Sequence, residues 1–141
     1  KRFFNFCKNM IEFRKAHPVL RRTSFFTGMN SNGNSSSDIS WHGFEIGKPD
    51  WSENSHCIAF MLNGNKAVTG ADLNDNNIYV AINAHWENQT FHLPTPAIKK
   101  YWHLAVDTSA STGFKTPGKE TRVKTSVITV PPRSIIILID K

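Results

Sequence analysis

The stretch NIYVAINAHW, residues 77–86, decides the fold of this 141-residue chain. Alternate residues of a β-strand share a face, and neither face of this stretch carries a charge. One face holds Ile78, Val80, Ile82 and Ala84, and the other holds Tyr79, Ala81 and Asn83. A strand with two uncharged faces needs a neighbouring strand on both edges and cover on at least one face. The stretch therefore predicts the centre of a β-sheet.

Three other apolar stretches are candidates to pair with this central strand. They are residues 57–62 (CIAFML), 101–107 (YWHLAVD) and 134–139 (SIIILI). In the second of them, the residues expected on one face are Trp102, Leu104 and Val106. Shorter strands are predicted at residues 39–42, 90–93 and 125–130. Seven short strands divided by turn residues are typical of an antiparallel β-sandwich, so the chain is expected to be mainly β.

Residues 2–16 carry the one helical pattern of the chain. Two apolar stripes run along it at spacings of three and four residues. The first stripe is Phe3, Phe6, Met10 and Phe13, and the second is Phe4, Cys7 and Ile11. Together they are wider than the apolar side of an ordinary surface helix, so we expect the helix to pack against two bodies. His17 should end the helix, because a residue that precedes proline is disfavoured in the α region.

The segments between these elements have the composition of loops. Residues 29–38, MNSNGNSSSD, predict a mobile loop. Residues 19–26 predict a connector, and residues 43–55, 63–76 and 108–120 predict longer connections.

One of these connections partly matches a calcium-binding loop. Asp72, Asn74 and Asn76 alternate like the first ligands of an EF-hand. The sixth position of such a loop should be Gly and the twelfth Glu, but here they are Asn77 and Asn83. The alternative is a turn in which Asn and Asp side chains bond to nearby backbone, and we expect no metal site.

The charge pattern argues against a nucleic-acid partner. Seventeen Lys and Arg against eleven Asp and Glu give a net charge of +6. The basic residues are scattered, apart from Arg21-Arg22 and Lys99-Lys100, and form no basic stripe. No apolar run approaches the ~20 residues of a membrane helix, so no membrane partner is expected either.

The two cysteines, Cys7 and Cys57, are too few for a disulfide framework or a zinc quartet. We expect two buried thiols in a reducing compartment. The chain begins at Lys1 inside the predicted helix, and we therefore expect a fragment of a longer protein.

The sequence carries no recognisable catalytic motif. Six histidines are scattered, and His92 and His103, on two predicted strands, are expected to form at most a solvated pair. Glycoside hydrolysis needs two carboxylates that flank the scissile bond, and Asp50 and Glu53 lie close together in a loop. A position on the loop surface explains them equally well. Without a nucleophile elbow, phosphate loop or dinucleotide fingerprint, we expect no catalytic residue and no cofactor.

Four tryptophans remain as candidate ligand contacts. An exposed indole can stack on the apolar face of a sugar ring. Trp41 and Trp102 fall within strands and are expected to be packed. Trp51 and Trp86 lie in or beside loops and are the two candidate sugar contacts, with anchoring of the loops as the alternative.

Seven segments occur in an order that is similar to one enzyme family. They are FRKAHPVLRR (13–22), SWHG (40–43), GKPDWSENS (47–55), IYVAINAHWE (78–87), LP (93–94), WHLAVDT (102–108) and PPRSIIIL (131–138). The set resembles the C-terminal region of isoamylase-type and bacterial glycogen debranching enzymes of the α-amylase superfamily. FRKAHPVLRR together with PDWSENS is specific, whereas PPRSIIIL alone indicates only the wider superfamily.

The resemblance implies the layout of a longer enzyme. In this family a (β/α)8 barrel carries the active site, and an antiparallel β-sandwich follows it. Residues 1–22 would be the last barrel helix with its connector, and residues 23–141 the sandwich. The family's catalytic carboxylates lie on barrel strands upstream, and none maps onto this chain. The resemblance also implies a cytoplasmic protein, or one of the plastid stroma in a plant.

Three functions are in competition on this basis. The first is a non-catalytic C-terminal domain of a glycogen or starch debranching enzyme, inactive by itself, which stabilises the barrel that hydrolyses α-1,6-glucosidic branch linkages. The alternative is a carbohydrate-binding module that holds α-glucan at Trp51 or Trp86, weakly, because an open loop surface lacks an enclosed pocket. An interaction domain with no sugar role is a third reading.

The helix predicts how the chain would behave without a barrel. The stripe that contains Phe6, Met10 and Phe13 is expected to lose its partner, while Phe4 and Ile11 face the sandwich. Two copies would then pair helix to helix in a symmetric dimer, unless the helix rotates against its own sandwich.

Overall fold

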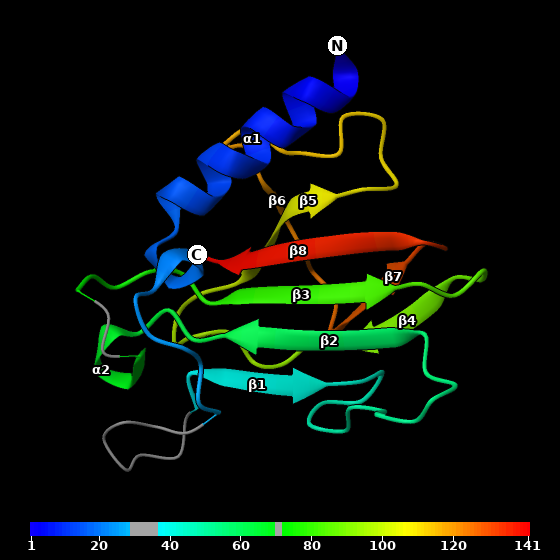
Figure 1. Cartoon of the computed structure of the whole chain (residues 1–141), viewed down its shortest axis with the longest axis horizontal. Coiled ribbons are helices and arrows are strands. Elements are labelled where there is room, and N and C mark those ends of the chain that lie inside the picture. Colours follow the sequence, from blue (N-terminus) through cyan, green and yellow to red (C-terminus); the bar gives the residue numbers. More distant parts are fainter. Residues whose placement is uncertain (29–36, 70–71) are drawn as a thin grey trace.

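Figure 1 shows a helix lying across a β-sheet in the computed structural model of the chain. The structure describes residues 1–28, 37–69 and 72–141, so the predicted mobile loop at 29–38 lies almost entirely outside the described residues. The elements are α1 (Arg2–Ala16), η1 (Pro18–Arg21), β1 (Ile39–His42), β2 (Cys57–Leu62), α2 (Lys66–Thr69), β3 (Ile78–Asn83), β4 (Gln89–His92), β5 (Trp102–Asp107), β6 (Thr121–Arg122), β7 (Val127–Val130) and β8 (Ser134–Asp140).

The strands form two antiparallel sheets. The larger sheet has the order β1-β2-β3-β8-β5-β6, and the smaller one pairs β4 with β7. β3 lies in the middle of the larger sheet, with β2 and β8 hydrogen-bonded to its two edges. The predicted pairing with residues 57–62 and 134–139 is confirmed, whereas β5 pairs with the far edge of β8. The expected class, a mainly β antiparallel fold with an N-terminal helix, is confirmed as well.

The two sheets enclose an inner core. β3 contributes Tyr79 and Ala81, which have no exposed surface, and β4 contributes Phe91 from the smaller sheet. Its other buried members are Ala59, Leu93, Trp102, Val130, Ile136 and Leu138. The predicted burial of Trp102 is confirmed, and its indole N–H donates to the carbonyl of Pro94 at 2.7 Å.

The opposite face of the larger sheet carries a second apolar layer, which we call the outer face. Its β3 residues are Ile78, Val80 and Ile82. In the sheet register they lie beside Leu62, Phe60 and Ile58 of β2 and beside Ile139, Ile137 and Ile135 of β8. The helix and the segment after it cover part of this face.

α1 packs on the outer face through Phe6, Met10 and Phe13. The exposed apolar residues of the helix are Phe3, Phe4 and Ile11. The prediction that Phe4 and Ile11 face the sandwich is therefore wrong. Phe6, Met10 and Phe13 of the other stripe face it instead, while Phe3 is exposed. The end of the helix explains this rotation, because the Phe13 ring lies edge-on to Phe114 at 6.1 Å and 4.4 Å from the ring of His17.

A β-bulge changes the predicted face of one residue on β5. The pairing of β5 with β8 shifts register between Leu104 and Val106. Leu104 therefore packs against the inner core, while Ala105 and Val106 belong to the layer on the outer face. The prediction that Val106 shares a face with Leu104 is wrong, because strict alternation does not reveal a bulge.

Some short elements were not predicted from the sequence. The described chain has eight strands where seven were expected, because the two-residue β6 is too short to show a period. η1 and α2 lie in segments predicted as connections. Cys7 and Cys57 are free, half-buried thiols. None of the described helices is long and apolar enough to cross a bilayer.

A buried His–Asp hydrogen bond and a buried ion pair tie the segment after α1 to the rest of the fold. His17 Nδ1 lies 2.8 Å from a carboxylate oxygen of Asp75, whose second oxygen accepts a hydrogen bond from the Val19 backbone. Arg22 donates to the Asp38 carboxylate at 3.0 Å. The path of the chain from the helix into β1 is therefore fixed at both ends.

Candidate functional site

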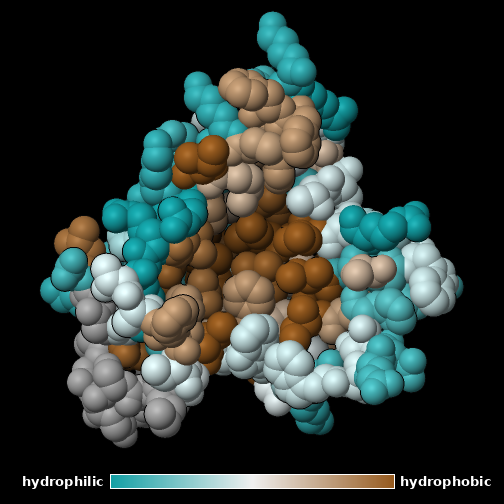
Figure 2. Space-filling view, in the orientation of Figure 1, coloured by the Kyte–Doolittle hydropathy of each residue, from teal (hydrophilic) through white to brown (hydrophobic). Residues whose placement is uncertain are grey.

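The first candidate site is the outer face. The sheet register aligns apolar side chains in rows across β1, β2, β3 and β8. One row is Trp41, Phe60, Val80 and Ile137, and the next is Ile39, Leu62, Ile78 and Ile139. Figure 2 shows hydrophobic side chains gathered over the middle of this face, beside the helix. A groove of about 420 Å³ runs between α1 and the sheet, lined by Met10, Leu20 and Val80 among others.

Two tryptophans extend the outer face at its β1 edge. The ring of Trp41 lies 5.5 Å from that of Phe60, and Trp51 stands edge-on to Trp41 at 5.3 Å. Trp41 is 41% exposed and Trp51 65% exposed. The prediction that Trp41 is packed is therefore wrong, and Trp51 lies beside the outer face.

His42 shapes the loop that carries Trp51. Its buried imidazole accepts a hydrogen bond at Nδ1 from the Gly47 backbone, and its Nε2 lies 2.9 Å from Ser40 Oγ. Since Nδ1 accepts, the ring is neutral with its proton on Nε2. Burial lowers the pKa of His42, which favours the same state. Gly47 has a φ of +70°, and a Cβ on Gly43 would collide with the backbone of the loop.

The second candidate site is a groove where the β1–β2 loop meets the β3–β4 loop, at the right-hand end of β2 and β3 in Figure 1. We call it the loop groove. It encloses about 490 Å³, within the range of small-ligand sites. Its lining includes Lys48, Asn54, His56, His85, Trp86 and Gln89.

Three aromatic rings form one wall of the loop groove. Trp86 stacks on His85 with ring centres 4.0 Å apart, and His56 stands at 72° to Trp86 at 5.7 Å. His85 is held in turn, because its Nδ1 accepts hydrogen bonds from the Glu87 backbone and the Gln89 side chain. Trp86 remains 63% exposed. The structure therefore separates the two candidate sugar contacts, since Trp86 lies in the groove and Trp51 beside the outer face.

His56 and His85 were not among the residues predicted to form a site. A signal for them was present in the strand pairing, because Cys57 lies opposite Asn83 in the register. That register extends by one residue, and the Ala84 backbone donates to the carbonyl of His56 at 2.8 Å. A correct β2–β3 pairing thus brings the two imidazoles together.

Three polar side chains of the loop groove are open to a ligand. Within the described part of the chain, the Lys48 ammonium, the Asn54 amide and the Trp86 indole N–H make no hydrogen bond. Groups of both charge signs line the space, since Glu45 and Asp50 lie there beside Lys48. This arrangement suits a neutral ligand with many hydroxyl groups.

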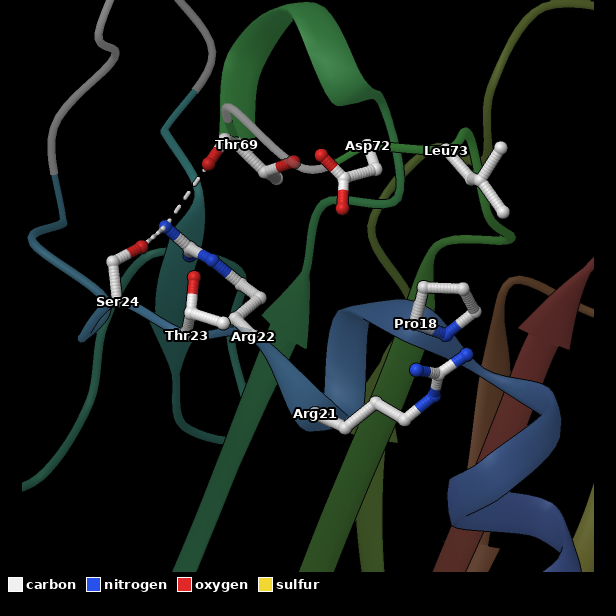
Figure 3. A pocket seen from close by; sticks show the side chains of 8 residues that line it. All are labelled: Pro18, Arg21, Arg22, Thr23, Ser24, Thr69, Asp72 and Leu73. Atoms are coloured by element: carbon white, nitrogen blue, oxygen red, sulfur yellow. Dashed lines mark hydrogen bonds between the residues drawn. The ribbon is translucent and has the colours of Figure 1, made fainter.

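A smaller cavity of about 180 Å³ lies beside η1 (Figure 3). Arg21 and Arg22 both line it, but their side chains point apart. The Arg22 guanidinium donates to Asp38, to Ser24 Oγ at 3.2 Å and to the carbonyl of Thr69 at 3.1 Å. Its charge therefore holds the connector to the sheet.

The loop carboxylates and strand histidines form no common site. Asp50 accepts a hydrogen bond from the Ser52 backbone at 3.0 Å, and this bond lowers the pKa of Asp50. Glu53 is exposed. His92 and His103 lie in different sheets, on β4 and β5, so they form no pair.

Two side chains of the calcium-like alternation hydrogen-bond to the backbone of other segments. Asn74 accepts a hydrogen bond from the Lys66 backbone, and Asn76 donates to the carbonyl of Asp140. Asp72 lines the cavity beside η1. In the three described ranges, no group of three or more His, Cys, Asp or Glu residues is arranged to hold a metal ion.

The family pattern and the similar proteins all point to isoamylases. The sequence pattern of the family described as "Isoamylase 1-3, C-terminal" matches residues 40–130. Isoamylase of Pseudomonas amyloderamosa is 34% identical over 99% of this chain, and isoamylase of Flavobacterium sp. is 30% identical over 96%. Isoamylase SU1, chloroplastic, of Zea mays is 34% identical over 86%. The chain spans only 18% of the length of the two bacterial relatives and 14% of the maize one.

A solved structure shares the fold. Pullulanase from Bacillus acidopullulyticus superimposes with a TM-score of 0.54 over 98% of this chain and 14% of its own length. Its sequence identity in that region is 19%, so the likeness concerns the fold.

Proposed function

The chain belongs to the isoamylase C-terminal domain family, and on that premise we propose that it is the non-catalytic C-terminal domain of a debranching enzyme. In this proposal a catalytic barrel in the same polypeptide hydrolyses α-1,6-glucosidic branch linkages of glycogen or starch. The barrel packs on the outer face, and the chain contributes stability to it. The small share of each relative that the chain spans supports this view, because most of the relative lies outside the matched region.

The observation that carries the proposal is the apolar outer face. Rows of Ile, Val, Leu and Phe cross four strands, and Trp41 and Trp51 continue them at one edge. α1 covers one side of the rows and leaves a hydrophobic surface beside it (Figure 2). Large apolar patches on soluble domains mark surfaces of interaction.

The rigid corner after the helix supports the division of the chain. The hydrogen bond of His17 with Asp75 and the ion pair of Arg22 with Asp38 hold α1 and η1 against the sheet. Residues 1–22 would be the last helix of the barrel with its connector, and residues 23–141 the sandwich. A helix anchored in both domains would hold the barrel and the sandwich in one orientation.

The outer face also distinguishes this proposal from an independent carbohydrate-binding module. A module that works alone must cover its apolar layers with its own polar surface. Here the apolar layer of the outer face is left partly open, so a second protein domain explains this surface better than a sugar ligand does. Binding of α-glucan is then an additional property of a docked domain.

The same relationship supports a proposal for the compartment. We propose that the protein acts in the cytoplasm, or in the plastid stroma if it comes from a plant. The plant relatives are named as chloroplastic, and the two free thiols fit a reducing environment.

The test compares the chain alone with the full-length polypeptide that carries it. We expect Phe60→Gln with Ile137→Gln to destabilise the full-length protein more than the isolated chain, by about 2 kcal/mol or more, because burial of each side chain is worth about 1.5–3 kcal/mol. Thermal unfolding of both forms measures the difference. The matched control is Thr90→Gln with Thr129→Gln, an exposed cross-strand pair on the smaller sheet.

Equal destabilisation in the two forms would contradict the proposal. Sedimentation of the isolated chain tests the alternative that a second copy of the chain packs on the outer face. A dimer that dissociates in the Phe60 and Ile137 double variant, without extra loss in the full-length protein, would identify a second copy as the partner.

A further inference from the structure

We propose that the loop groove is an α-glucan site separate from the catalytic one, with Trp86 as its stacking platform. The choice of polymer rests on the proposed function, while the site itself rests on the geometry of the groove. The ligand would be a short stretch of α-1,4-linked glucose units, held next to the domain surface.

Trp86 has the properties of a preorganised platform. Its indole is 63% exposed, and stacking on His85 fixes its orientation. His85 is fixed by hydrogen bonds to the Glu87 backbone and to Gln89, so the platform is held before a ligand arrives. Preorganisation reduces the entropy lost on binding.

The angle between the rings favours an α-linked chain. Trp86 and His56 stand at 72° to each other. Flat β-1,4-linked glucans present successive sugar faces to rings that lie in one plane. The α-1,4 linkage turns each glucose relative to the last, and such a chain can place successive faces against two inclined rings.

The polar rim fits glucose hydroxyls. Lys48, Asn54 and the Trp86 indole N–H supply unused donors in the lining of the groove. Glu45 and Asp50 outnumber Lys48 among the charged lining residues, so the space does not favour an anion. Burial of the ligand is incomplete in an open groove, which implies weak binding.

The position of the loop groove allows binding while a barrel is docked. It lies beyond the ends of β2 and β3, where Cys57 and Asn83 pair, whereas the outer-face rows lie over the strands. Figure 2 shows hydrophilic residues at that end of the molecule and hydrophobic ones over the centre. The two surfaces are therefore distinct.

The experiment titrates this chain with maltohexaose in a calorimeter. The chain lacks the barrel, so binding by an active site does not interfere. We expect saturable binding that Trp86→Ala weakens about tenfold or more, a change in affinity of one decade. Trp86→Phe keeps a ring and should retain part of the affinity. Trp51→Ala is the matched control, an exposed loop tryptophan outside the groove that should leave the affinity unchanged.

Three results would overturn the inference: no saturable binding by the wild type, unchanged affinity in a folded Trp86→Ala variant, or equal affinity for cellohexaose. Thermal melting verifies that each variant is folded. The Phe60 and Ile137 double variant separates this inference from barrel docking, because its sugar binding should persist even where docking is lost.

Discussion

His42 must stay neutral for the β1–β2 loop to keep its shape. Its Nδ1 accepts the Gly47 backbone N–H, and a protonated ring would turn that acceptor into a donor. Burial holds the pKa of His42 below its ordinary value of 6.5. Below about pH 6.5, His42 therefore binds a proton in the unfolded chain but stays neutral in the folded chain. The stability of the fold consequently falls as the pH decreases.

We accordingly expect the wild type to lose more stability than His42→Gln on acidification from about pH 8 to about pH 5. Glutamine is neutral at both pH values, so the variant cannot take up this proton. Urea unfolding at the two pH values measures the effect. His103→Gln, at a histidine outside the loop, is the control and should behave like the wild type. Identical acid losses in all three proteins would show that His42 is not the sensitive group.

Asp38 is a second residue whose charge state matters for stability. Burial by itself raises the pKa of Asp38, but hydrogen bonds from the Thr27 and Gly28 backbone and from Arg22 outweigh it and lower the pKa overall. Asp38→Ala leaves Arg22 without its buried carboxylate, and we expect a loss of about 3–5 kcal/mol in the free energy of unfolding. Chemical denaturation is the measurement. A loss below about 1 kcal/mol, as for an exposed pair, would refute this role.

Helix α1 offers a direct check of its rotation. Phe13→Ala should cost about 3–5 kcal/mol, because Phe13 is buried between the sheet and Phe114. Phe4→Ala is the matched control in the isolated chain and should stay within about 0.5 kcal/mol, since Phe4 is exposed. Denaturant unfolding of both variants decides the matter. The reverse order of losses would restore the rotation expected from the sequence.

The helix also shows which part of a fold can be read from sequence. Its bounds, Arg2–Ala16, are those predicted, because Pro18 acts on the backbone locally. The prediction of which side of the helix faces the sheet was wrong. Both stripes are apolar, and only contacts from distant segments, such as Phe114, determine which stripe is buried. The β5 bulge was missed for a related reason, since it depends on the pairing with β8.

Part of the candidate site could likewise be predicted from the sequence, and part of it could not. Trp86 was identified from its place beside a loop, and it lines the loop groove. Trp51 was selected by the same rule, yet it packs beside Trp41 at the outer face. The two loops look alike in composition, and only the register of β1 with β2 places Trp41, and hence Trp51, on that side. His56 could be assigned to the loop groove only once the register of β2 with β3 was known.

The molecule as a whole should have no glucan hydrolase activity by itself. Asp50 is engaged with Ser52 in a loop turn, and Glu53 is exposed, so the two carboxylates do not enclose a scissile bond. We expect no release of reducing ends from pullulan or glycogen by the isolated chain. Activity that disappears in Asp50→Asn or Glu53→Gln would contradict this.

The place of β8 has a consequence for how the protein is made. β8 follows all other strands in sequence, yet it lies between β3 and β5 in the sheet. During synthesis on the ribosome, the apolar β2–β3 pair emerges before β8 and must wait for its second edge until Ser134–Asp140 has left the exit tunnel. Chain growth at about 5–20 residues per second makes this a delay of seconds with an open apolar edge. A nascent chain of this kind is a natural client for a chaperone.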